Sequence, residues 1–177
     1  MEVKNVFYLL LRYGILIVLG IPNLYLFYLI FTPATVYPTF WILDYIYDAV
    51  LFPGNTIFFK GYYASIIPAC VAGSAYYLLL ILNLTTPMGI KKRIGSIFFL
   101  FGSFLLLNLL RISIFASLIT KGYQYFDIAH TATWYFGSTV MIIIIWFANV
   151  LIFRIYTIPV YTDLKNITKD LKSKKEK

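Results

Sequence analysis

The chain has 177 residues, of which 61% are hydrophobic and 12% are charged. A soluble domain rarely buries so much apolar surface, so the composition indicates one integral membrane domain over residues 1–177. The formal net charge of +8 does not indicate nucleic-acid binding. Much of it lies in the basic triplet Lys91-Lys92-Arg93 and the basic tail 154–177, where cytoplasmic segments of membrane proteins carry such charge. The single cysteine excludes an internal disulfide.

The first apolar run covers residues 6–31 and predicts a spanning helix. Arg12 interrupts what would be the hydrophobic region of a signal peptide, and no A-x-A-like cleavage site follows. We therefore expect this helix to be retained, with Arg12 reaching toward the inner interface.

The link 32–63 contains Asp44 and Asp48, one helical turn apart among aromatic residues, and then the helix-stopping sequence Pro53-Gly54-Asn55. Its apolar part is too short and too acidic to span a membrane. We expect an interfacial helix on the outer surface. It could act as a lid or a rest for a substrate, or simply connect and pack.

Three further apolar runs predict spanning helices, at residues 65–84, 94–119 and 128–153. The positive-inside rule places the basic triplet and the basic tail in the cytoplasm, so both termini lie inside. The links 32–63 and 120–127 then lie outside and contain only two cations, Lys60 and Lys121. We predict an all-α, multi-pass helix bundle of the plasma membrane, with about four spans.

Three residues that are unusual in apolar helices fall at the outer side of this arrangement. Cys70 lies ~9 Å below the outer start of its helix and Arg111 ~12 Å below the outer end of its own, at 1.5 Å per residue. His130 lies near the outer start of the last helix. Asn108 precedes Arg111 by three residues and shares its face.

Each residue also has a purely structural interpretation. A membrane cysteine is usually a packing residue, and a histidine at a helix start is often interfacial. An arginine well inside an apolar helix is harder to explain, because its insertion costs ~2.5 kcal/mol or more. Together the three types fit acyl transfer: a thiolate nucleophile, a histidine proton carrier and a guanidinium that stabilises an oxyanion. The small residues from Ala69 to Ala75 allow close approach of a neighbouring helix.

The blocks around these residues resemble a known family. The sequences PACVAGSAYYLL, NLLRISIF and FDIAHTATWYFG are similar, in this order, to the three signature blocks of the exosortase/archaeosortase family. The resemblance covers roughly residues 60–150. Many members have Ser or Thr after the cysteine and Gly next, whereas Val71 and Ala72 precede Gly73 here. Many members are also longer, with eight spans.

The resemblance implies a membrane cysteine transpeptidase. Its partners would be secreted proteins with a C-terminal sorting signal, made of a short motif, a hydrophobic helix and a basic cluster. Cys70 would form a thioester at the outer face, His130 would move protons, and Arg111 would hold the oxyanion or activate the thiol. The acceptor nucleophile could be carried by a membrane lipid. No cofactor is implied, and the sequence offers too few ligands for a metal site.

Two other classes of function remain possible on the sequence. In a non-catalytic transporter subunit or assembly factor, Arg111 and His130 would line a polar pathway and Cys70 would be packing. A redox role is weaker, because no second cysteine can resolve a disulfide.

Overall fold

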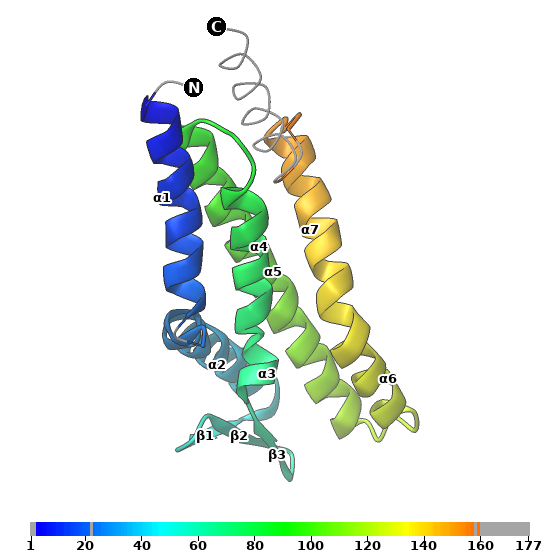
Figure 1. The fold of residues 1–177 in the computed structure, drawn as a ribbon. Helices are drawn as coiled ribbons and strands as arrows, with labels where there is room; N and C mark the ends of the chain where they lie inside the picture. Colours follow the sequence, from blue (N-terminus) through cyan, green and yellow to red (C-terminus); the bar gives the residue numbers. More distant parts are fainter. Residues whose placement is uncertain (1–2, 22, 158, 160–177) are drawn as a thin grey trace, which may run out of the picture.

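The computed structural model describes residues 3–21, 23–157 and 159 (Figure 1). Its helices are α1 (Val3–Gly20), α2 (Tyr25–Tyr47), α3 (Pro68–Val71), α4 (Gly73–Leu84), α5 (Ile90–Thr120), α6 (Phe126–Ala132) and α7 (Ser138–Ile152). A π-helical segment, Thr133–Gly137, joins α6 to α7. Three short strands follow α2: β1 (Val50–Phe52), β2 (Thr56–Phe59) and β3 (Tyr62–Ser65). The protein is therefore mostly helical, as predicted, but not all-α.

Three helices of the described chain are long and apolar enough to cross a membrane: Tyr25–Tyr47, Ile90–Thr120 and Phe126–Ile152. The last two contain the predicted spans 94–119 and 128–153. The predicted spans 6–31 and 65–84 do not form single long helices, and the count of four is not confirmed. The predicted basic cytoplasmic tail lies mainly in residues 160–177, outside the described residues.

The predicted first span is divided at its centre. Helix α1 ends at Gly20, and Asn23 and Leu24 take left-handed backbone conformations with φ of 48° and 60°. The proline at position 22 disfavours a helical residue before it, which explains the stop. The second half of the predicted span therefore belongs to α2.

Helix α2 also absorbs the predicted interfacial helix of the link 32–63. It packs along α5, with the ring of Phe31 5.5 Å from Phe101 near its start. Near its end, the Thr120 hydroxyl donates a hydrogen bond to the Tyr47 hydroxyl at 3.4 Å. Phe31 also stacks on the buried Tyr76 of α4, with ring centroids 3.6 Å apart. Because its 23 residues are apolar enough to span, α2 is not the short surface helix expected from the sequence.

The strands form an antiparallel sheet in the order β1-β2-β3. The turns at Pro53-Gly54-Asn55 and Lys60-Gly61 contain four residues of positive φ, which sharp hairpin turns require. Ile57 and Phe59 of β2 are fully buried. Phe59 packs on Tyr47 of α2, with ring centroids 6.0 Å apart. The sheet therefore covers the end of the bundle at which α2 finishes (Figure 1).

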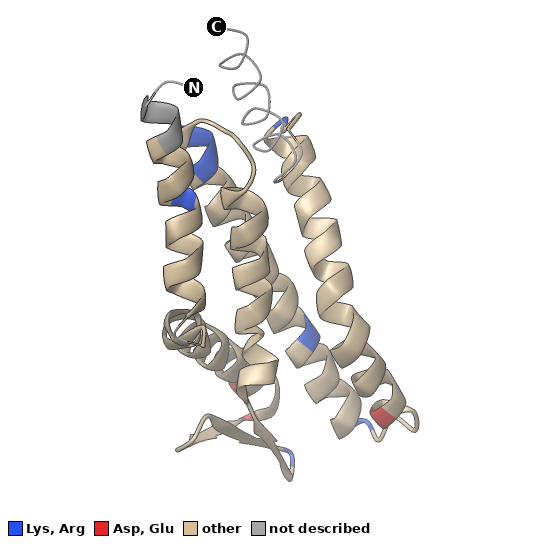
Figure 2. Ribbon diagram, in the orientation of Figure 1, with Lys and Arg blue, Asp and Glu red and all other residues tan. Residues whose placement is uncertain are grey.

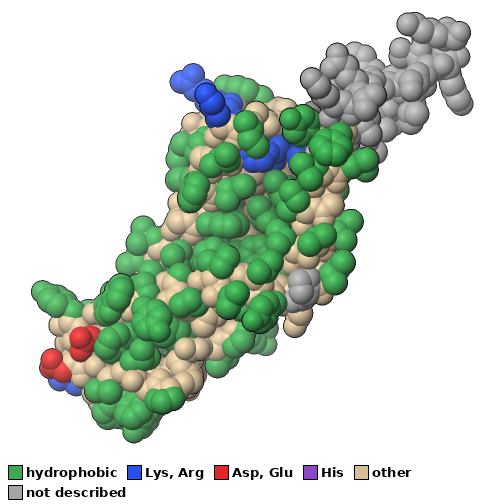
Figure 3. Space-filling view, turned by 90° about the vertical axis from the view of Figure 1, so that its left-hand side faces the viewer, with side chains coloured by type: hydrophobic (Ala, Val, Ile, Leu, Met, Phe, Trp, Pro, Cys, Tyr) green, Lys and Arg blue, Asp and Glu red, His purple; other side chains and the backbone are tan. Residues whose placement is uncertain are grey.

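The charged residues lie mostly at the two ends of the molecule. Figure 2 shows Lys and Arg at the end where α1 begins. The acidic residues lie near the sheet and the α5–α6 turn, where Lys60 and Lys121 also lie. In Figure 3, hydrophobic side chains cover the surface between these ends. Arg111 is the one cation of the described chain in the apolar middle of α5 (Figure 2).

Arg93 of the basic triplet is buried. Its guanidinium donates to the carbonyl oxygens of Asn83 at 2.6 Å and Thr86 at 2.9 Å, which lie at the C-terminal end of α4. Ser96 accepts a hydrogen bond from Asn83 at 2.7 Å and donates to Asn149 of α7 at 2.8 Å. This network joins α4, α5 and α7 at the basic end, so Arg93 has a structural role there.

Candidate functional site

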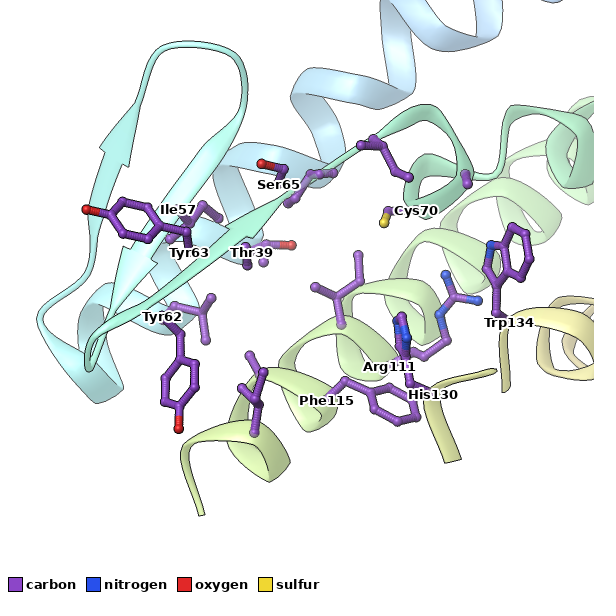
Figure 4. Close-up of a pocket in the computed structure, with 18 of the residues that line it drawn as sticks. Thr39, Ile57, Tyr62, Tyr63, Ser65, Cys70, Arg111, Phe115, His130 and Trp134 are labelled. Carbon is purple, nitrogen blue, oxygen red and sulfur yellow. The ribbon is translucent and has the colours of Figure 1, made fainter. Parts of the chain in front are cut away.

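A cavity of about 440 Å³ lies between the sheet, α2, α3, α5 and α6. Cys70, Arg111 and His130 all line it (Figure 4). Its size is within the usual range for ligand sites, and most of its other walls are apolar or aromatic. Three residues from separate elements, chosen from the sequence for their chemistry, thus lie around one space.

Cys70 is held by a short and interrupted helix. The chain leaves β3 in an extended conformation, Pro68 starts α3, and the Cys70 amide donates to the Ile67 carbonyl at 2.8 Å. Ala72 then takes a left-handed conformation with φ of 58°, and α4 begins after it. Cys70 therefore lies in the first turn of α3 rather than ~9 Å down a long helix. A helix of one turn also supplies little of the dipole expected to favour the thiolate.

The break at Ala72 interrupts the helical hydrogen bonding around Cys70, and α5 supplies a partner. Asn108 Nδ2 donates to the Cys70 carbonyl oxygen at 2.8 Å. Asn108 is fully buried, and this partly buried bond ties α3 to α5. Arg111 lies three residues further along α5 and on the same side. One helix thus positions both the backbone of the cysteine and the guanidinium.

Arg111 is half-buried in the cavity wall, and its Nη1 donates to the hydroxyl of Ser138 at 3.1 Å. It forms no salt bridge with a carboxylate in the described part of the chain. The guanidinium points toward the α3 side of the cavity in Figure 4. A cation without a carboxylate partner can stabilise a thiolate or an oxyanion.

His130 borders the open side of the cavity, where much of its ring is exposed. The ring stacks on Phe126 at 5.5 Å between centroids and meets Phe115 edge-on at 5.2 Å. Two aromatic neighbours restrict the plane of the imidazole while leaving its access to the cavity. This position suits proton exchange between a bound molecule and water.

The π-helical segment directly follows the helix that carries His130. Such segments are rare and are frequent at functional sites. A Cβ on Gly137 would lie 2.8 Å from Cγ2 of Thr133, so a larger residue there would require Thr133 or the segment to shift. Ser138, the hydrogen-bond partner of Arg111, comes immediately afterwards. The π turn thus sets the relation between Ser138 and His130.

The small residues after Cys70 have the packing role expected of them at one position. A Cβ on Gly73 would lie 2.9 Å from the ring of Tyr28, so the start of α4 rests directly on α2.

The chain matches no family model, no curated protein and no solved structure. The likeness to the exosortase/archaeosortase family therefore rests on the three sequence blocks.

The sequence did not reveal several other residues of the site. Thr39 of α2 lines the cavity with a fully buried hydroxyl that has no hydrogen-bond partner in the described chain. Trp134 of the π segment and the residues of β3 also line it. The two turn sequences around β2 were the signal available for the strands. No three His, Cys, Asp or Glu side chains of the described residues are grouped as a metal site would require.

Proposed function

We propose that this protein is a membrane-embedded cysteine transpeptidase. The observation that supports it is the meeting of Cys70, Arg111 and His130 on one cavity. The resemblance to the exosortase/archaeosortase family supplies the substrate class: secreted proteins that end in a short motif, an apolar helix and a basic cluster. The activity also requires that the sheet end of the molecule faces outward, which fits the cations at the opposite end.

The reaction would proceed in two acyl transfers. The Cys70 thiolate attacks a peptide carbonyl carbon of the substrate, and Arg111 stabilises the negative charge that develops on the carbonyl oxygen. The C–N bond breaks, His130 gives a proton to the leaving amine, and the substrate remains as a thioester on Cys70. His130 then takes a proton from the acceptor, whose amine or hydroxyl displaces the thiol. A lipid-borne acceptor would reach the cavity from the membrane.

The direct test is co-expression with a substrate of the expected type encoded beside this protein. Wild type should shorten the substrate at its C-terminus, as read by mass spectrometry of the intact product, and Cys70→Ala should leave it uncut. The double variant Cys70→Ala, Ser74→Cys restores a thiol four residues along the chain, beyond the break at Ala72, and should remain inactive. Processing by Cys70→Ala at the wild-type rate would refute the proposal.

A thiol-labelling experiment separates this function from a non-catalytic membrane protein. In native membranes, a membrane-impermeant methanethiosulfonate should modify Cys70 from outside, and Cys70→Ala should remain unlabelled. A packing cysteine would resist the reagent. Absence of labelling in folded wild type would favour a transporter subunit or assembly factor.

A further inference from the structure

Strand β3 lies at an edge of the sheet and leads directly to the cysteine. The order β1-β2-β3 leaves one side of β3 without a strand partner. After Ser65 the chain passes through Ile66 and Ile67 in an extended conformation and enters α3, where Cys70 lies. The unpaired side of β3 is therefore continuous with the wall that carries the thiol.

The cavity follows this edge. Side chains of a strand alternate between its two faces, so a cavity against one face would touch every second residue. Here every residue from Tyr62 to Ile67 lines the cavity, whereas β2 contributes only Ile57 and Phe59, which share a face. The pattern places the open space beside β3, with α5 on the opposite wall (Figure 4).

The hairpin geometry fixes which backbone groups point into that space. Lys60 and Gly61 both have positive φ, 47° and 85°, as in a two-residue turn of type I′. In such a hairpin the flanking pair, Phe59 and Tyr62, exchanges both backbone hydrogen bonds, and so does every second pair after it. The backbone N–H and C=O groups of Tyr63 and Ser65 therefore point away from β2.

A polar group of α2 on the cavity wall also lacks a partner. Thr39 is buried beside the cavity, and its hydroxyl has no hydrogen-bond partner within the described residues. Leaving such a group unpaired is costly. A bound molecule with hydrogen-bonding groups, such as a polypeptide backbone, would fit this wall better than a purely apolar one.

We propose that an extended peptide segment of the substrate binds here as a fourth strand, paired with the outer edge of β3. This inference rests on the proposed function for the role of Cys70 as the group that receives the peptide. Backbone pairing at Tyr63 and Ser65 aligns the segment along the cavity and brings a later carbonyl to the thiol. A second copy of the sheet does not fit this position, because α5 and α6 stand opposite the edge. An acyl chain would leave the polar groups unpaired.

The test measures binding separately from thiol chemistry. Full-length protein in lipid nanodiscs is irradiated with an alanine-valine pentapeptide amide that carries a diazirine, and crosslinking is quantified by mass spectrometry. A series of the same peptide is N-methylated at one residue at a time. Strand pairing predicts that methylation at alternate residues lowers crosslinking about fivefold, the effect of one lost hydrogen bond, while the residues between change little.

Protein variants test the same edge from the other side. Tyr63→Pro removes an outward N–H of β3 and should reduce crosslinking to a similar extent, whereas Tyr63→Val keeps the N–H and should bind well. Leu51→Pro is the matched control. In the observed register Leu51 pairs with Ile57, whose hydrogen bonds go to β3, so its own N–H points outward from the opposite edge of the sheet. It should leave crosslinking unchanged.

The outcomes are distinguishable. A methylation pattern without the two-residue period, or equal binding by Tyr63→Pro and wild type, overturns strand pairing. The same pentapeptide as a chloromethyl ketone then reports on Cys70. Periodic crosslinking without alkylation of Cys70 supports the edge site and overturns the transpeptidase. Alkylation without the period leaves a reactive thiol but overturns the binding mode.

Discussion

Asn108 of α5, whose side chain is fully buried, donates a hydrogen bond to the backbone carbonyl of Cys70 at 2.8 Å. The contact joins the segment that carries the thiol to the helix that carries Arg111. It makes Asn108 a positioning residue, and its effect can be separated from general stability.

Asn108→Leu should therefore lower both stability and thiol reactivity. The Cys70 carbonyl would lose its buried donor, at a cost of about 1–3 kcal/mol in the free energy of unfolding. Alkylation of Cys70 by N-ethylmaleimide should slow, because α3 loses its bond to α5. Asn149→Leu is the control, because Asn149 is also fully buried but lies in the network at the basic end. It should lower the melting temperature while leaving the alkylation rate near wild type. Equal alkylation rates in the two variants would argue against a positioning role.

Arg111 should matter for its charge and for its shape. Arg111→Gln removes the guanidinium that lines the cavity together with Cys70, and we expect alkylation to slow about tenfold, because the reacting sulfur loses a nearby positive charge. Arg111→Lys keeps the charge and should alkylate at nearly the wild-type rate. It should still process substrate poorly, because an ammonium lacks the planar fork of the guanidinium. Arg12→Gln, in α1 at the other end of the molecule, serves as the control. A neutral residue at 111 with unchanged thiol reactivity would contradict the assignment.

The π-helical segment leads to a prediction in which a second substitution should restore what the first one removes. Gly137→Ala places a methyl group 2.8 Å from Cγ2 of Thr133, so the segment must shift or straighten. We expect a loss of about 1–3 kcal/mol in unfolding free energy and a loss of processing, as Ser138 turns away from Arg111. Thr133→Ser removes the methyl group that the new Cβ would contact. The double variant should therefore recover much of the unfolding free energy and of the processing. Failure of the rescue would mean that the glycine is required for another reason.

The contact of α4 with α2 leads to a similar experiment. Gly73→Ala should destabilise the protein by about 1–3 kcal/mol, because the added Cβ meets the ring of Tyr28 at 2.9 Å. Combining Gly73→Ala with Tyr28→Leu removes the ring and should restore part of the lost unfolding free energy. Thermal unfolding in detergent measures both. Gly102→Ala, where no atom lies within 4 Å of the new Cβ, provides the neutral comparison.

Orientation in the membrane can be read with introduced thiols. In a Cys70→Ala background, Lys60→Cys and Lys121→Cys should react with a membrane-impermeant maleimide applied to intact cells. Lys91→Cys should react only after the membrane is opened, because the basic end is expected in the cytoplasm. Labelling of position 91 from outside would reverse the orientation and with it the proposed access of secreted substrates.

The sequence predicted which polar side chains lie near one another better than it predicted the path of the backbone around them. Cys70, Arg111 and His130 were selected because each is unusual in an apolar run, and they line one cavity. The long helices were also evident, since the predicted span 94–119 lies within Ile90–Thr120. Such long apolar runs strongly favour a helix, so tertiary contacts did not change the predicted structure there.

The errors arose where a few residues change direction. The sheet was missed because its strands are only three or four residues long, and only the turns at Gly54 and Gly61 marked it. The break at Ala72 has no signal in residue type, because alanine normally favours a helix. Ser138 could not be foreseen either, because its approach to Arg111 depends on the π turn before it.

The left-handed residue Ala72 has one more consequence, for how the thiol and the guanidinium are held relative to each other. The turn that carries Cys70 is separated from α4 by that residue and is bonded to α5 through Asn108. Helix α5 also carries Arg111. The spacing of sulfur and guanidinium therefore depends on α5 and its bond to α3 more than on α4.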